Sequence, residues 1–454
     1  MPLPMPIMFA IAVLGMVVAG VYVFGLTKRW GILLPFIGLI VFGSMALPLD
    51  WNDKVKPTIW LPVQSQRSGL FLAAGIAGSL IVLAQVWRTR GKRLSASALL
   101  MLVIGLYAAM MRFVHEGPVD GALSVVFAVA TIVPLLFASM LVIDKPDDLR
   151  ILMRGAVVAN IVWLGMIAMQ VVIDPDMVTM GNEFRFVGLY SNPQHSGVLM
   201  AFFLVISLWM MLNERGRIAL LMLGVVGING LLLLWTGSRT GLGMAIIGVS
   251  ATLYSRAGRA ILLLPLAAII GYVGLKVMVD VLGITLGFER LTSTANTRDE
   301  AWGTLVSVAM ENPLFGAGTE GAEKSENSWL YGFASYGFGM LVLLLVLALV
   351  ASVEILKTVR ARFVVPAEYR SSLDFMVGLL LMYFAGAVLE GYMISRVSST
   401  LCFFLTISVA NVNIRRMLLG HQGQAMYDQD WDTQSVPYGD DEIYEQDEQL
   451  GYAS

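Results

Sequence analysis

The sequence is poor in cysteine and in charge, and each shortage excludes a class of protein. Its 454 residues include one cysteine, Cys402, which lies inside an apolar run. One cysteine rules out a disulfide framework and a cysteine metal site, so we expect Cys402 to be a packing residue. Only 14% of the residues are charged, against about 25% in a soluble domain, and mean hydropathy is +0.76. The chain is therefore expected to lie in a lipid membrane.

Several catalytic signatures are also missing. The sequence has no GxxxxGK[ST] loop, no HExxH and no DxD pair in the first expected outer loops. Nothing therefore indicates ATP-driven or metal-dependent catalysis, and we predict neither a metal nor a cofactor. The first apolar run lacks a basic segment before it and a small-residue cleavage site after it. We interpret it as a retained span rather than a signal peptide.

What the sequence does contain is a series of long apolar runs. About 20 apolar residues cross a bilayer as a helix, and these runs are continuous rather than alternating, which favours helices over a barrel. We predict an all-α polytopic integral membrane protein with about twelve or thirteen transmembrane helices. The expected spans cover residues 6–26, 31–48, 68–87, 95–112, 120–143, 151–173, 196–213, 217–235, 239–254, 260–283, 329–354, 372–391 and 397–414.

The short basic loops give an expected orientation, because Lys and Arg near span ends favour the cytoplasm. They fall on one side if every second loop is cytoplasmic: Lys28-Arg29, Arg88/Arg90/Lys92/Arg93, Lys145/Arg150/Arg154, Arg215/Arg217, Arg256/Arg259, Lys357/Arg360/Arg362/Arg370 and Arg415-Arg416. The expected location is an inner or plasma membrane. The N-terminus would then lie outside and the C-terminus in the cytoplasm.

Two domains follow from the hydropathy. Residues 1–421 form the expected transmembrane domain. Residues 422–454 form an expected acidic, disordered cytoplasmic tail. The tail also contains aromatic residues, so a binding site for a cytoplasmic partner is the alternative interpretation. The loop at 284–328 is too long for a simple connection, so it is either functional or disordered. Its mixture of Trp302, Phe315 and glycines with charges indicates order.

Five arginines break the charge rule by lying on the expected outer side: Arg185, Arg239, Arg290, Arg298 and Arg396. Ion pairs explain some of them equally well, with Glu183, Glu289, Asp299 or Glu390 as partners. Arg239 has no acidic neighbour within its loop, residues 236–241, so we expect a bound anion there. The segment 185–197 leads into a helix start with exposed amides, which also suits an anion. The alternative is a capped helix start with His195 as a satisfied interfacial residue.

The loop at 284–328 carries the remaining candidates. Arg298 and Trp302 are four residues apart and would share one face of a short helix that ends before Asn312-Pro313. The segment 316–318 (Gly-Ala-Gly) allows a tight turn before Glu326. Arginine binds phosphate oxygens bidentately, and a nearby carboxylate accepts a proton. This combination suits a lipid-pyrophosphate sugar donor that is attacked by a hydroxyl.

These residues resemble the O-antigen ligase and Wzy-type polymerase superfamily. The resemblance covers roughly residues 185 to 345 and consists of an ordered set of short motifs. They are Arg185, Gly188 and Asn192-Pro193; Gly237-Ser238-Arg239; Arg298 and Trp302; Asn312-Pro313-Leu314-Phe315-Gly316-Ala317-Gly318; Glu326-Asn327 with Leu330; and Gly337-Phe338-Gly339.

The resemblance implies a metal-independent inverting glycosyltransferase that uses undecaprenyl-pyrophosphate-linked saccharides as donor and acceptor at the periplasmic face. It also implies a multi-pass protein of the bacterial inner (cytoplasmic) membrane, with the N-terminus periplasmic and the C-terminus cytoplasmic. It implies catalytic roles for Glu326, Arg298 and Arg239. The substrate-binding residues that we predict are Arg185, His195, Arg290, Trp302 and Asn327. A polysaccharide flippase and a chain-length regulator are the protein partners that the family implies, beside the bilayer; nucleic acid is not expected.

Three functions remain open at this stage. Where the lipid A ligases carry histidine this chain has Glu326, which favours a polymerase of O-antigen, capsule or exopolysaccharide repeat units. A ligase that transfers glycan to an acceptor such as lipid A core is the alternative within the same class. A flippase or transporter is the rival from another class, although transporters usually carry ionisable groups at mid-membrane depth.

Overall fold

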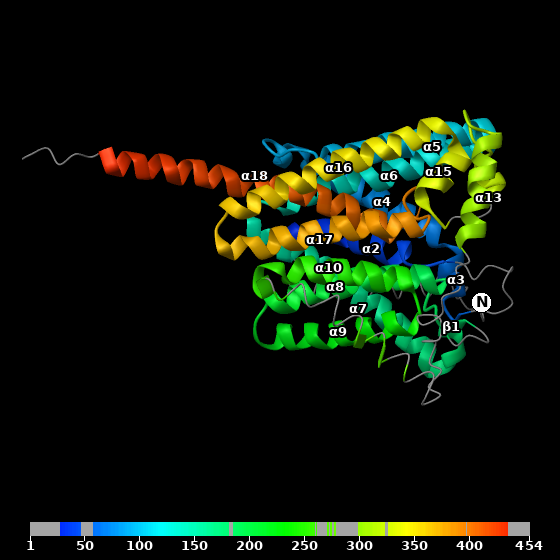
Figure 1. The fold of residues 1–454 in the computed structure, drawn as a ribbon, viewed down its shortest axis with the longest axis horizontal. Coiled ribbons are helices and arrows are strands. Elements are labelled where there is room, and N and C mark those ends of the chain that lie inside the picture. Colours follow the sequence, from blue (N-terminus) through cyan, green and yellow to red (C-terminus); the bar gives the residue numbers. More distant parts are fainter. Residues whose placement is uncertain are drawn as a thin grey trace, which may run out of the picture.

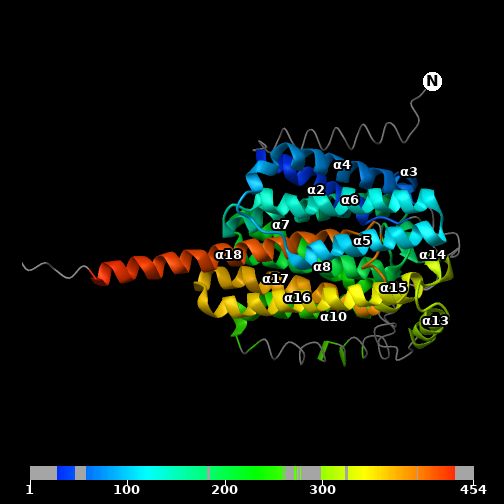
Figure 2. The same cartoon turned by 90° about the horizontal axis from the view of Figure 1, so that it is seen from above.

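The protein is a bundle of long helices, seen in a computed structural model that describes residues 28–46, 58–180, 185–258, 298–322, 326–395 and 397–434, with 260, 270–271, 273–274 and 277. The long helices run side by side along one axis in two perpendicular views, and the helix over residues 298–311 crosses that axis at one end (Figures 1 and 2). Over the described ranges, nine helical segments are long and apolar enough to cross a membrane. The protein is therefore an all-α, multi-pass membrane protein.

Most helices share one continuous apolar core, and a smaller separate cluster contains Leu305, Ala309, Ala322 and Ala334. In chain order the helices are α2 (Lys28–Gly43), α3 (Leu61–Ser65), α4 (Arg67–Gln85), α5 (Ala96–His115), α6 (Pro118–Val142), α7 (Leu149–Ile173), α8 (Pro193–Asn213), α9 (Gly216–Trp235), α10 (Arg239–Ala257), α13 (Arg298–Glu311), α14 (Gly318–Gly321), α15 (Ser328–Tyr336), α16 (Phe338–Val364), α17 (Ala367–Leu389) and α18 (Ser399–Gln434).

Most predicted spans correspond to one helix each. The spans expected at 31–48 and 239–254 are α2 and α10, which are helical but fall short of the length or apolar content of the nine. The expected spans at 6–26 and 260–283 lie wholly or largely outside the described residues.

The span predicted over 329–354 is wrong, because that run contains a corner. Helix α15 ends at Tyr336, Gly337 adopts a positive φ of 79°, and α16 starts at Phe338. A Cβ at Gly337 would lie 2.2 Å from the carbonyl oxygen of Leu314, so only glycine fits. The loop after α13 is bound to this corner, with the amide of Phe338 donating to the Pro313 carbonyl at 2.8 Å. The membrane-crossing helix is therefore α16, and α15 lies at the end of the bundle.

Three helices form the centre of the core through stacked aromatic rings. Trp209 of α8 stacks on Phe375 of α17 at 4.5 Å between ring centroids. Tyr383 of α17 stacks on Phe404 of α18 at 4.4 Å. Such contacts add to the stability that burial of apolar area already provides. The predicted packing role of Cys402 is confirmed, since this α18 residue is fully buried beside them.

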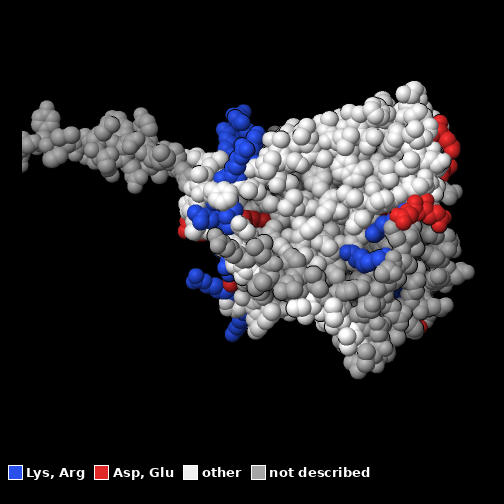
Figure 3. All heavy atoms as spheres, in the orientation of Figure 1, with Lys and Arg blue, Asp and Glu red and all other residues white. Residues whose placement is uncertain are grey.

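The two ends of the bundle differ in charge. Lysines and arginines gather at the end from which α18 projects (Figure 3), which is where α8 ends and α9 begins. Helix α18 continues as far as Gln434, into the first part of the expected tail, and the rest of the tail lies outside the described residues. The opposite end carries α13, α14 and α15, and we call it the α13 end (Figure 1).

A short antiparallel pair, β1 (Thr179–Met180) with β2 (Arg185–Phe186), lies at the α13 end. Its register places Met180 opposite Arg185. The pair brings the backbone at 185–192 up to the first turn of α8, where Asn192 caps the helix by accepting from the Gln194 amide at 2.8 Å. The pair thereby places Arg185 close to the first turn of α8.

Candidate functional site

Three of the predicted arginines lie together at the α13 end. Arg185 of β2, Arg239 at the start of α10 and Arg298 at the start of α13 line one small hollow with Gln194 and residues 237–240. We call these three residues the arginine group. They come from segments separated by more than fifty residues of sequence, so only the fold brings them together.

The loop before α10 lines part of this hollow. Gly237 adopts a positive φ of 59°, and the Ser238 hydroxyl caps α10 by accepting from the amide of Gly241 at 3.1 Å. The first turn of α10 therefore sits directly beside the arginine group. Because helix N-termini carry a partial positive charge, this turn adds to the attraction for an anion.

Close packing of α8 on α10 fixes the position of that loop. A Cβ at Gly197 would lie 2.3 Å from the Cβ of Ser238, and one at Gly241 would lie 2.5 Å from the Gly197 carbonyl carbon. Two glycines thus allow the backbones to approach to a distance that no side chain permits.

The three arginines differ in exposure and in contacts. Arg185 is only 3% exposed, and its Nε donates to the carbonyl of Thr236 at 2.8 Å. Arg298 is partly buried, whereas Arg239 is exposed. The group therefore extends from the interior of the protein to its surface, as a site for a ligand entering from outside requires.

Arg298 is held by a buried carboxylate that follows α17. Its Nη2 lies 3.1 Å from Oε1 of Glu390 and donates to the Thr240 hydroxyl at 2.7 Å. The Thr240 hydroxyl donates to the same Oε1 at 3.0 Å. With its amide nitrogen turned toward the carboxylate, Gln194 donates to both Glu390 oxygens at 3.2 Å. Glu390 was one of several acids expected to pair with an outer arginine, and the structure assigns it to Arg298.

Burial dominates the electrostatics of Glu390, which is 2% exposed. It raises the pKa of the carboxyl from 4.5 to about 7, while the Arg298 guanidinium and the Thr240 hydroxyl act in the opposite direction. The nearby carboxylate of Glu326 raises the pKa further. Glu390 thus changes its charge near neutral pH, directly beside an arginine of the site.

Glu326 lies close enough to Glu390 to interact with it electrostatically, while Trp302 and Asn327 lie on α13 and at the start of α15. The short helix expected at Arg298 is confirmed as α13, and Trp302 lies one turn along it with a buried indole N–H that meets no acceptor among the described residues. The Oε2 atom of Glu326 is likewise buried with no donor among the described residues. Asn327 caps α15 by accepting from the amides of Trp329 and Leu330 at 2.9 and 3.0 Å.

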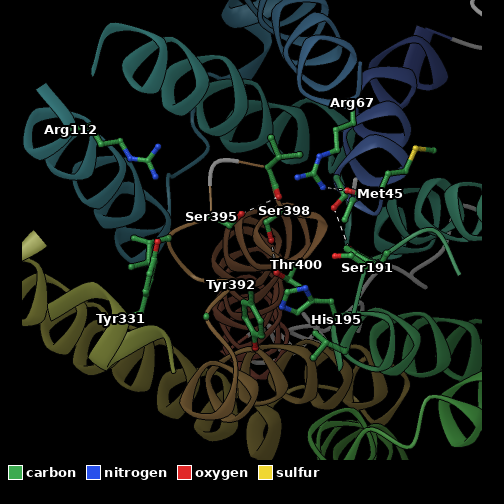
Figure 4. A pocket seen from close by; sticks show the side chains of 17 residues that line it. Met45, Arg67, Arg112, Ser191, His195, Tyr331, Tyr392, Ser395, Ser398 and Thr400 are labelled. Carbon is green, nitrogen blue, oxygen red and sulfur yellow. Dashed lines mark hydrogen bonds between the residues drawn. The ribbon is translucent and has the colours of Figure 1, made fainter. Parts of the chain in front are cut away.

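His195 lies apart from the arginine group, in the wall of a larger cavity of about 380 Å³ (Figure 4). Gln194, the residue before it, faces the arginine group, so the first turn of α8 separates the two spaces. The His195 ring packs edge-on against Tyr190, with the two ring centroids 6.0 Å apart. Arg67 and Arg112 also line this cavity. Of the predicted site residues, Arg290 lies outside the described residues.

Sequence reasoning did not identify Glu390, Arg67 or Arg112 as site residues, although one signal was present. Each lies at the outer end of an expected span, as Arg239 does, so the charge rule that singled out the outer arginines applies equally to Arg67 and Arg112. Gln194 and Thr240 carry no comparable signal, because uncharged polar residues are common near helix starts.

The arrangement can bind a multiply charged anion through guanidinium groups and amides, with two carboxylates close by to accept a proton. Comparison with known protein families and with curated proteins gave no match for this chain.

Proposed function

We propose that the chain is a membrane glycosyltransferase that polymerises saccharide repeat units carried on undecaprenyl pyrophosphate. The observation that supports this most directly is the arginine group beside the first turn of α10. Three guanidinium groups and a helix N-terminus in one hollow match the charge of a pyrophosphate. Under this proposal the α13 end faces the periplasm, and the donor lipid reaches the hollow from the bilayer.

The reaction is a displacement at the anomeric carbon of the donor sugar. A hydroxyl of the acceptor saccharide attacks from the face opposite the pyrophosphate, so the configuration inverts. The new bond joins the acceptor oxygen to the anomeric carbon, and the bond from that carbon to the pyrophosphate oxygen breaks. Arg239 and Arg298 stabilise the charge that develops on the leaving pyrophosphate, as preorganised donors do. The arginines supply this charge in place of a metal ion.

Glu326 is the proton acceptor in this proposal. Its buried Oε2 has no donor among the described residues, so it is available to take the hydroxyl proton. Glu390 is the positioning residue, because it binds Arg298 and Thr240 at once. In this proposal Trp302, one turn along α13 from Arg298, contacts the sugar.

The test is complementation of an in-frame deletion, with surface glycan size resolved on a gel and undecaprenyl-linked intermediates extracted from the same cells. We expect Glu326→Gln and Arg298→Gln to lose long polymer and retain single repeat units, with a rate loss of roughly 100-fold or more.

The matched controls are charge changes outside the site. Glu320→Gln alters an exposed acid of α14, and Arg154→Gln alters an arginine that pairs with Glu214 on the other half of the bundle. Both should produce polymer of normal length. Normal polymer from Glu326→Gln would remove Glu326 from catalysis. Full-length polymer accumulating on undecaprenyl in the deletion would indicate a ligase, and repeat units trapped on the cytoplasmic leaflet a flippase.

A further inference from the structure

The cavity that contains His195 has a composition of its own. It lies at the α13 end between the first turns of α4 and α8, the end of α5 and the segment that joins α17 to α18 (Figure 4). Its volume of about 380 Å³ is within the range of small-molecule sites. Its described lining includes hydroxyl groups and three tyrosines but no carboxylate: Tyr190, Ser191, Tyr331, Tyr392, Ser395, Ser398 and Thr400.

Arg67 is the group in this cavity whose charge is not offset. Its guanidinium donates to the backbone carbonyl of Met45, and no carboxylate pairs with it among the described residues. Arg112, across the cavity, lies 3.8 Å from the Glu116 carboxylate and donates from Nε to the Tyr336 hydroxyl at 3.0 Å. One arginine is thus compensated and the other is not.

The cavity adjoins the arginine group without being part of it. Gln194 and His195 are consecutive in α8, and they line the hollow and the cavity respectively. Glu390 binds Arg298, whereas the next two residues, Gly391 and Tyr392, line the cavity. A saccharide in the cavity would therefore lie on the other side of Glu390 from the pyrophosphate.

We propose that this cavity binds an acidic sugar residue of the acceptor saccharide, with Arg67 as the partner of its carboxylate. The assignment of this sugar to the acceptor saccharide rests on the proposed function. Hydroxyl and tyrosine side chains suit the hydroxyls and the apolar face of a sugar ring. One uncompensated arginine matches a single negative charge, whereas a pyrophosphate matches the three arginines of the neighbouring hollow.

The test measures binding rather than transfer. Purified full-length protein in nanodiscs of uncharged lipid is titrated with methyl glucuronide and methyl glucoside, with saturation-transfer NMR as the readout. We expect the glucuronide to bind roughly ten-fold more tightly, the effect of one charge-assisted bidentate contact. Arg67→Gln should abolish that preference, and Arg67→Lys should retain part of it. Arg154→Gln, in α7 at the basic end of the bundle, should leave the preference for the glucuronide unchanged.

Several results would overturn the proposal. Equal binding of the two glycosides by the wild type would do so, as would an unchanged preference in an Arg67→Gln variant that keeps the wild-type melting temperature. Displacement of the glucuronide by equimolar pyrophosphate, or by anionic lipid in the nanodisc, would assign the cavity to a phosphate group instead.

The two proposals fail separately. If the deletion strain makes normal polymer while the purified protein still prefers the glucuronide, the polymerase proposal falls and the cavity assignment stands. If polymer is lost in the deletion strain but Arg67→Gln restores it fully and the glucuronide shows no preference, only the cavity assignment falls.

Discussion

Glu390 shows how one buried residue links the ionisation of the site to its geometry. In its ionised form it holds Arg298 by an ion pair, and in its neutral form it loses that attraction. A carboxyl whose pKa is raised to about 7 by burial passes between the two forms near neutral pH. Because this acid pairs with a member of the arginine group, we expect the position of Arg298 to be sensitive to pH.

This shift predicts a pH dependence of stability. The folded protein keeps the Glu390 proton up to about pH 7, while the unfolded chain releases it near 4.5. Because the folded state binds more protons between these values, stability is greatest below the unfolded pKa and falls as pH rises through the window. We expect Glu390 to contribute a decrease of roughly 1–3 kcal/mol from pH 4.5 to 7.5.

The measurement is the melting temperature of the purified protein in detergent across that range, for wild type and Glu390→Gln. The variant keeps the shape of the side chain and cannot ionise, so its melting temperature should fall less as the pH rises. Identical slopes for the two proteins would show that Glu390 does not titrate in this window.

At the scale of elements, the close approach of α8 and α10 is what holds the arginine loop in place. Gly241→Ala would put a Cβ 2.5 Å from the Gly197 backbone, so the two helices must separate. We expect a loss of about 1–3 kcal/mol, typical of overpacking, together with a strong loss of polymer, since Thr240 and Arg239 move with the helix. Melting temperature and glycan length report the two effects.

Gly243 offers the matched control on the same helix. A Cβ at Gly243 would meet no atom of the described residues within 4 Å, and alanine favours a helix over glycine. Gly243→Ala should therefore keep the wild-type glycan length and melt at the same temperature or slightly higher. Equal damage from both substitutions would mean that helix propensity or membrane insertion, rather than contact with Gly197, is responsible.

Elements with local signals were predictable from the sequence. Helix α13 begins at Arg298 and ends just before Asn312-Pro313, because proline stops a helix whatever surrounds it. The corner at Gly337 was not predictable, since hydropathy averages over it and its cause is the distant loop at 313–316. Contacts between segments far apart in sequence leave no periodic signal in either one.

The same distinction applies to the site. Arg185, Arg239 and Arg298 were identifiable because each breaks a charge pattern that single spans obey. Their assembly into one group depends on the packing of α8 on α10 and on the ion pair between Arg298 and Glu390. Neither contact can be read from a single sequence. The cavity beside His195 is lined by the ends of several helices and by the segment that joins α17 to α18, so no single segment indicates it.

At the scale of the whole molecule, the separation of charge between the two ends predicts how the protein lies in the membrane. The basic loops should face the cytoplasm and the α13 end the periplasm. Cys402 is fully buried, which makes the natural protein a suitable background for labelling introduced cysteines. In intact cells, a membrane-impermeant maleimide should label Glu320→Cys in α14. Arg217→Cys, at the start of α9, should react only after the membrane is permeabilised.

Both positions are exposed, so access rather than burial decides the outcome. The unmodified protein should stay unlabelled in both conditions, which checks that Cys402 is protected. The reverse pattern, with Arg217→Cys labelled in intact cells, would show that the protein has the opposite orientation and that the arginine group faces the cytoplasm. A lipid-linked donor displayed on the periplasmic leaflet would then be out of reach, and the polymerase proposal would fail with the orientation.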